Sequence, residues 1–302
     1  MGNSKNLPKR LIKTINLRTE CFRLIYEVFK RPNSTFELSF DEIEERLHTP
    51  RKTTLKICQD LKNLFDLELS TYRGNIRLGH KFYYQEQMLK DIVQKEAISE
   101  RFVAELEKHR VNGLACSPGT TVTECTIKLL PRKNLYREII TNNLSIKDLL
   151  DGETHNACII AGGLVNRDIN ATLGIDACEA FDRAKCDCGL IGVSGLDEDG
   201  SLYLQYYEEI EVLSHMAHSI LKRIYIVAAI EKLTKEDTHK FCSIKDLLKR
   251  SELEVCIITT HPENLKGDHE KRNRAEKVIK KLQDINKKRI ELIVAPLKAH
   301  EE

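Results

Sequence analysis

From residue 111 onward, short apolar β-rich runs alternate with helical stretches, and this alternation is the feature that most constrains the fold. The apolar runs lack strict polar alternation, as is usual for strands covered on both faces of a sheet. Strands that alternate with helices are typical of a mostly parallel open sheet with helices on both faces, an α/β fold. The expected strands are 138–143, 156–163, 186–195, 223–229, 254–260 and 289–296, and the main expected helices are 172–183, 205–222 and 270–286.

Three helical patterns and a hairpin precede this region. The first helical pattern covers residues 21–29. The second begins at Ser39, and Glu42 three residues later gives the spacing of a capping box. The third begins at 49–50, where a threonine is followed by a proline suited to a first helical turn. A glycine-asparagine turn predicts a hairpin over 67–78, and together these elements predict a winged helix-turn-helix.

The 302 residues are enough for two domains. The N-terminal part, residues 1–80, holds fifteen Lys and Arg against ten Asp and Glu, a local charge of +5. A local basic excess favours nucleic acid as a partner. The expected divisions are a basic arm over 1–16, a winged helix DNA-binding domain over 17–80, a linking helix over 81–110 and an α/β domain over 111–302.

The third helix is the candidate recognition helix. With Leu55, Cys58 and Leu61 facing inward, its other side carries basic and amide side chains suited to phosphates and base edges. Arginines of the predicted wing could reach an adjacent groove. The candidate DNA-binding residues are Arg51, Lys52, Thr53, Lys56, Gln59, Arg73 and Arg77. The alternative is a basic solvated helix in a winged helix that binds protein.

Polar and small residues lie at three expected strand ends: 117–121 ends the apolar stretch that begins at Gly113, and 141–143 and 162–163 end the expected strands 138–143 and 156–163. A helix that begins after a glycine-threonine turn presents free backbone N–H groups, which bind anions well. Asparagine side chains can meet sugar hydroxyls, and paired glycines permit close backbone approach. Because ligands bind beyond the carboxyl ends of parallel strands, we expect one site there. The candidate effector-binding residues are Ser117, Gly119, Thr120, Thr121, Thr141, Asn142, Asn143, Gly162, Gly163 and Lys232.

The order of these motifs resembles the sensor domain of the DeoR-type bacterial regulators. The motifs are SPGTT (117–121), TNN (141–143), AGG (161–163), GLIGVSGLDEDG (189–200) and AAIEK (228–232). The resemblance covers about 20–296. It implies a sensor fold similar to ribose-phosphate isomerases and CoA transferases, a phosphorylated sugar or related metabolite as effector, and oligomeric binding to operator DNA.

The sequence departs from the family pattern at several positions. Ser117 stands where the family usually has an acidic residue, and the segment 192–195 lacks its acid. The segment 229–232 keeps only the lysine of its motif. In the recognition helix, Cys58-Gln59 replaces a pair of arginines.

Carboxylates, cysteines and histidines of the chain could support three other kinds of chemistry. An isomerase-type enzyme needs a carboxylate base, which Asp197, Glu198 or Asp199 could supply; a solvated turn is the alternative. Cys178, Cys186 and Cys188 are spaced poorly for zinc. His215 and His218 lie three apart on a helix with no third ligand in view, so they are expected to be structural. A protein-binding adaptor with a nucleotide- or metabolite-sensing domain is a further possibility.

The favoured prediction is a transcriptional regulator and not an enzyme. We expect operator DNA, a phosphorylated small molecule and a second copy of the chain as partners, with no cofactor, metal or membrane. The ten cysteines without a signal peptide indicate reduced thiols and a cytoplasmic location. No apolar run approaches the roughly 18 residues of a membrane span.

Overall fold

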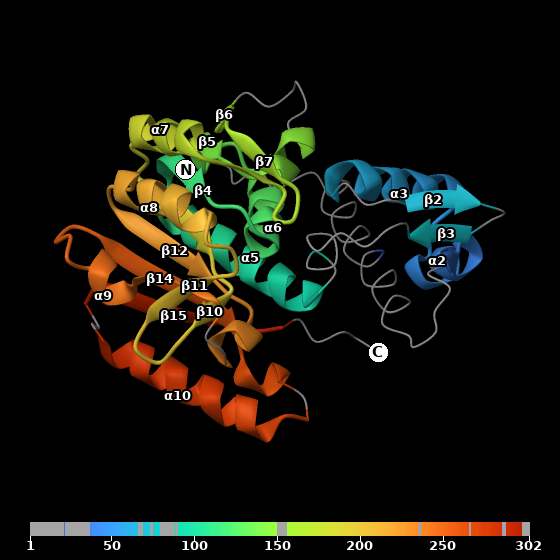
Figure 1. Ribbon diagram of the computed structural model, residues 1–302. Coiled ribbons are helices and arrows are strands. Elements are labelled where there is room, and N and C mark those ends of the chain that lie inside the picture. The colour runs from blue at the N-terminus through green and yellow to red at the C-terminus, as the bar shows by residue number, and fades with distance from the viewer. Residues whose placement is uncertain are drawn as a thin grey trace, which may run out of the picture. The chain divides into compact units, whose positions relative to one another are not determined.

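The computed structural model describes residues 21, 37–65, 69–72, 75–78, 88, 90–149, 156–234, 237–265, 267–285 and 288–297. The chain divides into two compact units, Met1–Ile92 and Val93–Glu302 (Figure 1). The predicted arm over 1–16 and all but Cys21 of the predicted first helix lie outside the described residues.

In the first unit, helix α2 (Phe40–Leu47) begins where the sequence predicts. The Ser39 side chain caps it by accepting a hydrogen bond from the Glu42 backbone N–H at 3.0 Å. Its apolar side is buried through Phe40, Ile43 and Leu47, and it ends at a left-handed residue, His48. The next helix, α3 (Arg51–Phe65), follows within three residues.

The expected hairpin is present as β2 (Leu69–Tyr72) and β3 (Asn75–Leu78), which pair antiparallel. A third strand that the sequence did not predict, β1 (Glu37–Ser39), pairs antiparallel with the other side of β3. The sheet order is therefore β1-β3-β2.

The second unit is built on a seven-stranded sheet in the order β15-β14-β12-β9-β4-β5-β6, and every neighbouring pair is parallel. This confirms the predicted α/β fold. The strands are β4 (Val111–Cys116), β5 (Tyr136–Thr141), β6 (Ala157–Ile160), β9 (Cys188–Gly192), β12 (Arg223–Val227), β14 (Glu254–Thr260) and β15 (Ile290–Ala295).

Helices cover both faces of this sheet. On one face lie α5 (Ile92–Lys108) and α6 (Thr120–Leu129). The ring of Phe102 in α5 packs against the ring of Tyr225 in β12, and the two ring centroids are 5.2 Å apart. On the other face lie α7 (Ile175–Ala184), α8 (Glu209–Ser219) and α10 (His269–Ile285). Apolar strands between two helical layers account for the absence of polar alternation.

The first helix of this unit differs from the sequence-based expectation. A single helix was expected over 81–110, but α5 begins at Ile92. A turn at 90–91 precedes it, and Asp91 has a left-handed backbone with φ of 53°. Four α5 residues, among them Ile98 and Leu106, are buried in the core of the second unit.

Smaller elements surround the main sheet. β7 (Leu164–Asn166) and β8 (Ala171–Leu173) form a hairpin, and β10 (Gly195–Leu196), β11 (Ser201–Leu204) and β13 (His239–Ser243) form an antiparallel sheet. The short helices are η1 (Leu144–Leu149), η2 (Ile230–Thr234), α9 (Ile244–Leu247) and η3 (Pro262–Asn264). Within the described ranges, no helix is both long enough and apolar enough to cross a membrane.

Candidate effector site at the carboxyl edge of the sheet

Three of the predicted segments follow neighbouring parallel strands. The register pairs Cys116 of β4 with Thr141 of β5, and Thr141 with Ile160 of β6. The segments 117–121 and 141–143 therefore leave the sheet at the same edge, and 162–163 follows two residues beyond β6.

The chain order also reverses next to this site. From β4 the sheet grows through β5 to β6 on one side, and then through β9 on the other side. Helix α6, which follows β4, packs on one face, whereas α7, which precedes β9, packs on the opposite face. The carboxyl ends of β4 and β9 thus form the topological switch point, where open α/β sheets bind ligands.

The turn after β4 leads into α6, whose N-terminus has no side-chain cap. Gly119 is the N-cap residue, with φ of 119° and no side-chain cap bond, and the first turn carries no acidic residue. Gly119, Thr120 and Thr121 are half-buried. Backbone N–H groups and the positive end of a ten-residue helix are favourable to an anion.

Ser117 connects the two strand ends at the switch point. Its Oγ accepts a hydrogen bond from the Gly192 backbone N–H at 3.0 Å and donates to the Pro118 carbonyl at 3.0 Å. The Ser117 side chain is fully buried. In this structure the hydroxyl therefore holds the ends of β4 and β9 together.

Thr141, the last residue of β5, and the two asparagines that follow it are fully buried, and their side chains form hydrogen bonds within the protein. Thr141 Oγ1 donates to the Cys116 carbonyl at 2.7 Å, and Asn143 Nδ2 donates to Thr123 Oγ1 at 2.8 Å. Asn142 Nδ2 donates to the Thr172 carbonyl of β8 at 2.8 Å. Asn142 Oδ1 is buried and has no hydrogen-bond partner among the described residues. Among the described side-chain acceptors of this segment, it is the one without a partner.

Gly162 and Gly163 are exposed at the end of β6. Gly163 has φ of 126°, and a Cβ atom there would lie 2.3 Å from the Leu173 carbonyl oxygen. Glycine at 163 is thus required by the close approach of β8. Lys232 lies in η2, beyond the carboxyl end of β12, and is half-buried.

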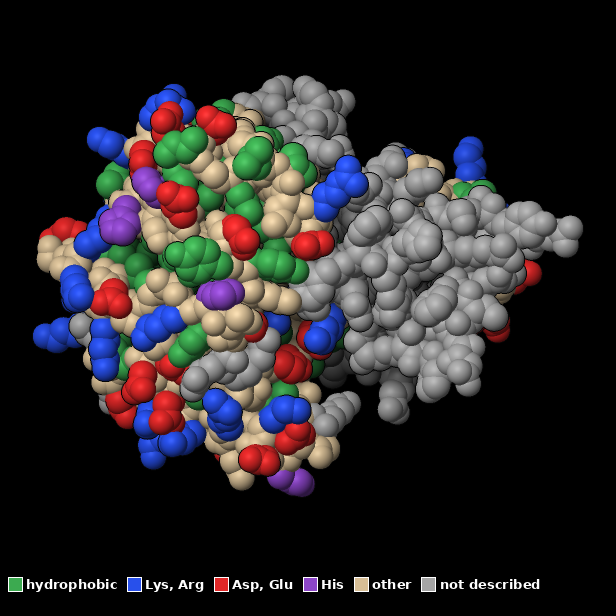
Figure 2. Space-filling view, in the orientation of Figure 1, with side chains coloured by type: hydrophobic (Ala, Val, Ile, Leu, Met, Phe, Trp, Pro, Cys, Tyr) green, Lys and Arg blue, Asp and Glu red, His purple; other side chains and the backbone are tan. Residues whose placement is uncertain are grey.

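A separate cavity of about 770 Å³ lies beside the β7–β8 hairpin. Its rim is apolar and open, with Leu164 78% and Tyr207 69% exposed, and hydrophobic side chains reach the surface around β7 (Figure 2). None of the predicted effector residues lines it. The lining residues are Leu164, Val165, Asn166, Leu173, Gly174, Tyr207, Glu208, Ile210 and Glu211.

The candidate catalytic carboxylates take part in structural contacts. Asp197 Oδ1 accepts hydrogen bonds from the backbone N–H groups of Asp199 and Ser201, and its Oδ2 accepts from the Tyr203 hydroxyl at 2.9 Å. Glu198 pairs with two lysines of α10, which lower the pKa of its carboxyl to about 2.

The candidate DNA-binding residues lie mainly along one side of α3. Lys52, Lys56 and Gln59 are exposed, and Thr53 is half-buried. Arg51 is also exposed, but its guanidinium forms ion pairs with Asp41 and Glu44 of the α2 region. Arg77 lies on β3, and Arg73 lies outside the described residues.

The buried side of α3 differs from the expected one. Leu55 was expected to face inward, but it is 43% exposed. Thr54, Ile57 and Cys58 are the buried residues of this helix turn, so the buried side is centred between 54 and 58. Leu55 follows Thr54 by about 100° around the helix axis and so points away from that centre.

The state of the cysteines agrees with the prediction, but the neighbours of Cys178 do not. All ten cysteines are free, as predicted for reduced thiols. Sequence spacing grouped Cys178 with Cys186 and Cys188, but the structure brings Cys178 next to Glu211 and His215. Glu211 and His215 are four residues apart, a spacing that places two side chains on one side of a helix and that could have indicated their proximity from the sequence.

The fold is an open α/β domain with a topological switch point, joined along the chain to a second, smaller unit. A family profile described as "DeoR C terminal sensor domain" matches residues 90–249. The chain therefore belongs to the DeoR C-terminal sensor domain family.

Two curated repressors are similar in sequence to part of this chain. It is 31% identical over 113 residues to the glycerol-3-phosphate regulon repressor of Escherichia coli, which covers 37% of this chain and 44% of that protein. The repressor of the same name from Haemophilus influenzae is 28% identical over 129 residues, covering 43% and 49%. The chain thus spans less than half the length of these curated relatives.

Among solved structures, eIF2B beta from Chaetomium thermophilum is 14% identical, with a TM-score of 0.33 over 76% of this chain and 60% of that chain. The 5-methylthioribose 1-phosphate isomerase from Pyrococcus horikoshii OT3 is 10% identical, with a TM-score of 0.33 over 72% and 63%.

Proposed function

We propose that this chain is a transcriptional regulator in which an N-terminal winged helix binds operator DNA and the C-terminal domain binds a phosphorylated small molecule. The observation that carries the proposal is the sensor-domain match over 90–249 in a chain that also holds an α3 face with exposed lysines. The proposed domains are a basic arm over 1–16, a winged helix over 17–80 and a linking segment that begins at 81 and leads into the sensor domain, whose compact unit spans Val93–Glu302.

The effector site that we propose is the switch point between β4 and β9. The uncapped N-terminus of α6 supplies N–H donors and Thr120 and Thr121 supply hydroxyls, which together suit a phosphate. Asn142 Oδ1 is buried without a partner among the described residues, and it would accept a hydrogen bond from a hydroxyl group of a ligand that enters between the strand ends. The curated relatives are named for glycerol 3-phosphate, so this compound is the first probe.

The regulator is favoured over an isomerase because of how the nearby carboxylates are used. Asp197 holds the β10–β11 turn and Glu198 pairs with Lys277 and Lys281, so neither is free to act as a base. The effector would act by favouring one arrangement of the DNA-binding units in a homo-oligomer. A cytoplasmic location belongs to the same proposal and agrees with the free cysteines.

The test uses the full chain and the variant Thr121→Asp. A carboxylate in the first turn favours the helix but repels a phosphate, so binding should be lost without loss of stability. Calorimetric titrations with glycerol 3-phosphate, ribose 5-phosphate and inorganic phosphate measure the affinity. The exposed variant Thr238→Asp is the matched control and should bind as the unaltered chain does.

Two results would count against the proposal. If the unaltered chain and Thr121→Asp bind all three compounds with equal affinity, the N-terminus of α6 is not the binding site. Turnover of ribose 5-phosphate would favour the enzyme, whereas binding without turnover favours the sensor.

A further inference from the structure

Helices α7 and α8 bring a thiol, an imidazole and a carboxylate together on the face of the sheet opposite α5. Cys178 lies in α7, and Glu211 and His215 lie one turn apart in α8. One ligand atom from each of the three lies within 4.8 Å of the other two. Figure 2 shows histidine side chains next to acidic ones at the surface of α8.

A fourth side chain orients the histidine. Asp182, one turn beyond Cys178 in α7, places Oδ2 2.8 Å from His215 Nδ1. A carboxylate at this distance favours the tautomer with the proton on Nδ1, which leaves the lone pair on Nε2. Histidines that bind metals commonly donate their other ring N–H to a carboxylate in this way.

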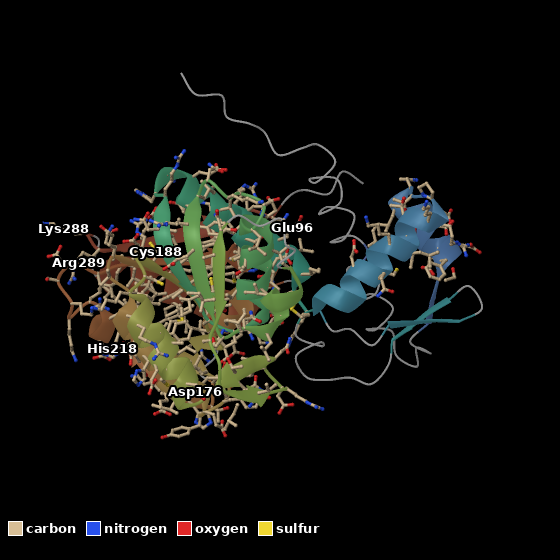
Figure 3. The ribbon with its side chains drawn as sticks, turned by 90° about the horizontal axis from the view of Figure 1, so that it is seen from above. Glu96, Asp176, Cys188, His218, Lys288 and Arg289 are labelled. Atoms are coloured by element: carbon tan, nitrogen blue, oxygen red, sulfur yellow. The ribbon has the colours of Figure 1, made fainter. Side chains whose placement is uncertain are left out.

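The two helices hold these side chains on rigid supports. In α7, Ala177 and Phe181 are fully buried on the turns that carry Cys178 and Asp182. In α8, Val212 and Met216 are fully buried beside Glu211 and His215. Figure 3 shows both helices from above, with Asp176 near the start of α7 and His218 near the end of α8.

We propose that Cys178, Glu211 and His215 bind a divalent transition-metal ion, best suited to zinc, with Asp182 orienting His215. Zinc takes thiolate, imidazole and carboxylate ligands in tetrahedral sites, and three protein ligands leave one position for water. Tetrahedral zinc needs ligand atoms about 3.3–3.8 Å apart. The half-exposed His215 and exposed Glu211 can move toward the buried Cys178 to reach this spacing.

The charges around the thiol agree with a cation site. The carboxylates of Glu211 and Asp182 lie near the Cys178 thiol and would repel its thiolate form. A bound cation offsets this repulsion, and the thiol proton is released on binding. Because Glu211 also lines the cavity beside β7, the ion would link α7 to α8 at the wall of that cavity.

The test is a Co²⁺ titration of the full chain after removal of metals with a chelator. Tetrahedral cobalt bound to a thiolate gives a sulfur-to-metal charge-transfer band, which Cys178→Ser should abolish. Glu211→Gln and His215→Gln should each weaken Co²⁺ binding at least about tenfold, and Asp182→Asn about 10–100-fold. Competition by Zn²⁺ should remove the band from the unaltered chain.

Matched controls come from the same elements. His218 lies in α8, but its Nδ1 is 2.7 Å from the Ser214 carbonyl oxygen, so His218→Gln should bind Co²⁺ normally. Cys242→Ser, which changes a half-buried thiol elsewhere, should retain the band. Absence of the band in the unaltered chain, or its persistence in both Cys178→Ser and His215→Gln, would overturn the proposal. If Cys178→Ser does not fold, His215→Gln, which changes a half-exposed side chain, tests the proposal in its place.

Discussion

Gln94 of α5 donates a hydrogen bond from Nε2 to Glu231 Oε1 at 2.7 Å, which ties the first helix of the sensor domain to the segment after β12. The Oε1 atom of Gln94 accepts from the Ile230 backbone N–H at 3.0 Å and from Thr260 Oγ1 at 2.5 Å. One side chain therefore joins α5 to the carboxyl ends of two strands. Lys232, a candidate effector residue, lies one position beyond Glu231.

Replacement of Gln94 by alanine should destabilise the domain. The Ile230 N–H is buried and would lose its acceptor, and a buried unpaired donor costs about 1–3 kcal/mol. We expect Gln94→Ala to lower the free energy of unfolding by about 2–3 kcal/mol. Urea unfolding followed by circular dichroism measures this, with the exposed Gln283→Ala as control. Equal unfolding midpoints for both variants would show that the hydrogen bonds of Gln94 contribute nothing to the free energy of unfolding.

Glu209 at the start of α8 gives a pH-dependent prediction. Burial raises the pKa of its carboxyl to about 7, partly opposed by a backbone hydrogen bond from Tyr206. A carboxyl with a higher pKa in the folded state than in the unfolded state takes up a proton on folding. Stability from this group is therefore present below the unfolded value of 4.5 and is lost as pH rises through about 7.

Glu209→Gln should remove the loss of stability that accompanies the rise in pH. The free energy of unfolding of the unaltered chain should fall between pH 5 and pH 8, with at most ~3 kcal/mol of the fall due to Glu209. The Gln variant should show a flatter profile and higher stability at pH 8. Urea unfolding across this range measures both. The exposed Glu276→Gln should keep the original slope, and a Glu209→Gln profile identical to that control would refute the assignment.

The main sheet could be predicted because its strands are apolar on both sides. The expected strand 254–260 coincides with β14, and the expected strand 289–296 contains β15. The β7–β8 hairpin and the small sheet of β10, β11 and β13 were not predicted, because these short strands lack the continuous apolar runs of the main-sheet strands. No pattern in the sequence indicates the break at Asp91, which has a left-handed backbone.

The candidate site was predictable only as a set of strand ends. Parallel strands place their carboxyl ends together, so 117–121 and 141–143 were expected at one edge. The partners of the side chains could not be predicted, because they are distant in the chain. Ser117 bonds to Gly192 and Asn143 to Thr123, 75 and 20 residues away. Such contacts decide which polar atoms remain for a ligand.

Two glycines with similar backbones should respond differently to alanine. Gly119 and Gly163 have φ of 119° and 126°, so either alanine strains the backbone by about 1–3 kcal/mol. At Gly119 a Cβ atom would meet nothing within 4 Å, whereas at Gly163 it would lie 2.3 Å from the Leu173 carbonyl oxygen. Gly163→Ala should thus lower the thermal midpoint more than Gly119→Ala. The reverse order would show that β8 can move away without cost.

The exposed lysines of α3 should determine how strongly DNA binding depends on salt. Each lysine that contacts a phosphate adds about 0.9 to the slope of log affinity against log salt. Lys52→Ala with Lys56→Ala should weaken binding to a mixed-sequence duplex and lower that slope by up to about 2. Fluorescence anisotropy at several salt concentrations measures both. The matched control is Lys240→Ala with Lys245→Ala, two exposed lysines of the sensor domain that should leave affinity and slope unchanged. If both double variants bind alike, α3 is not the helix that contacts DNA.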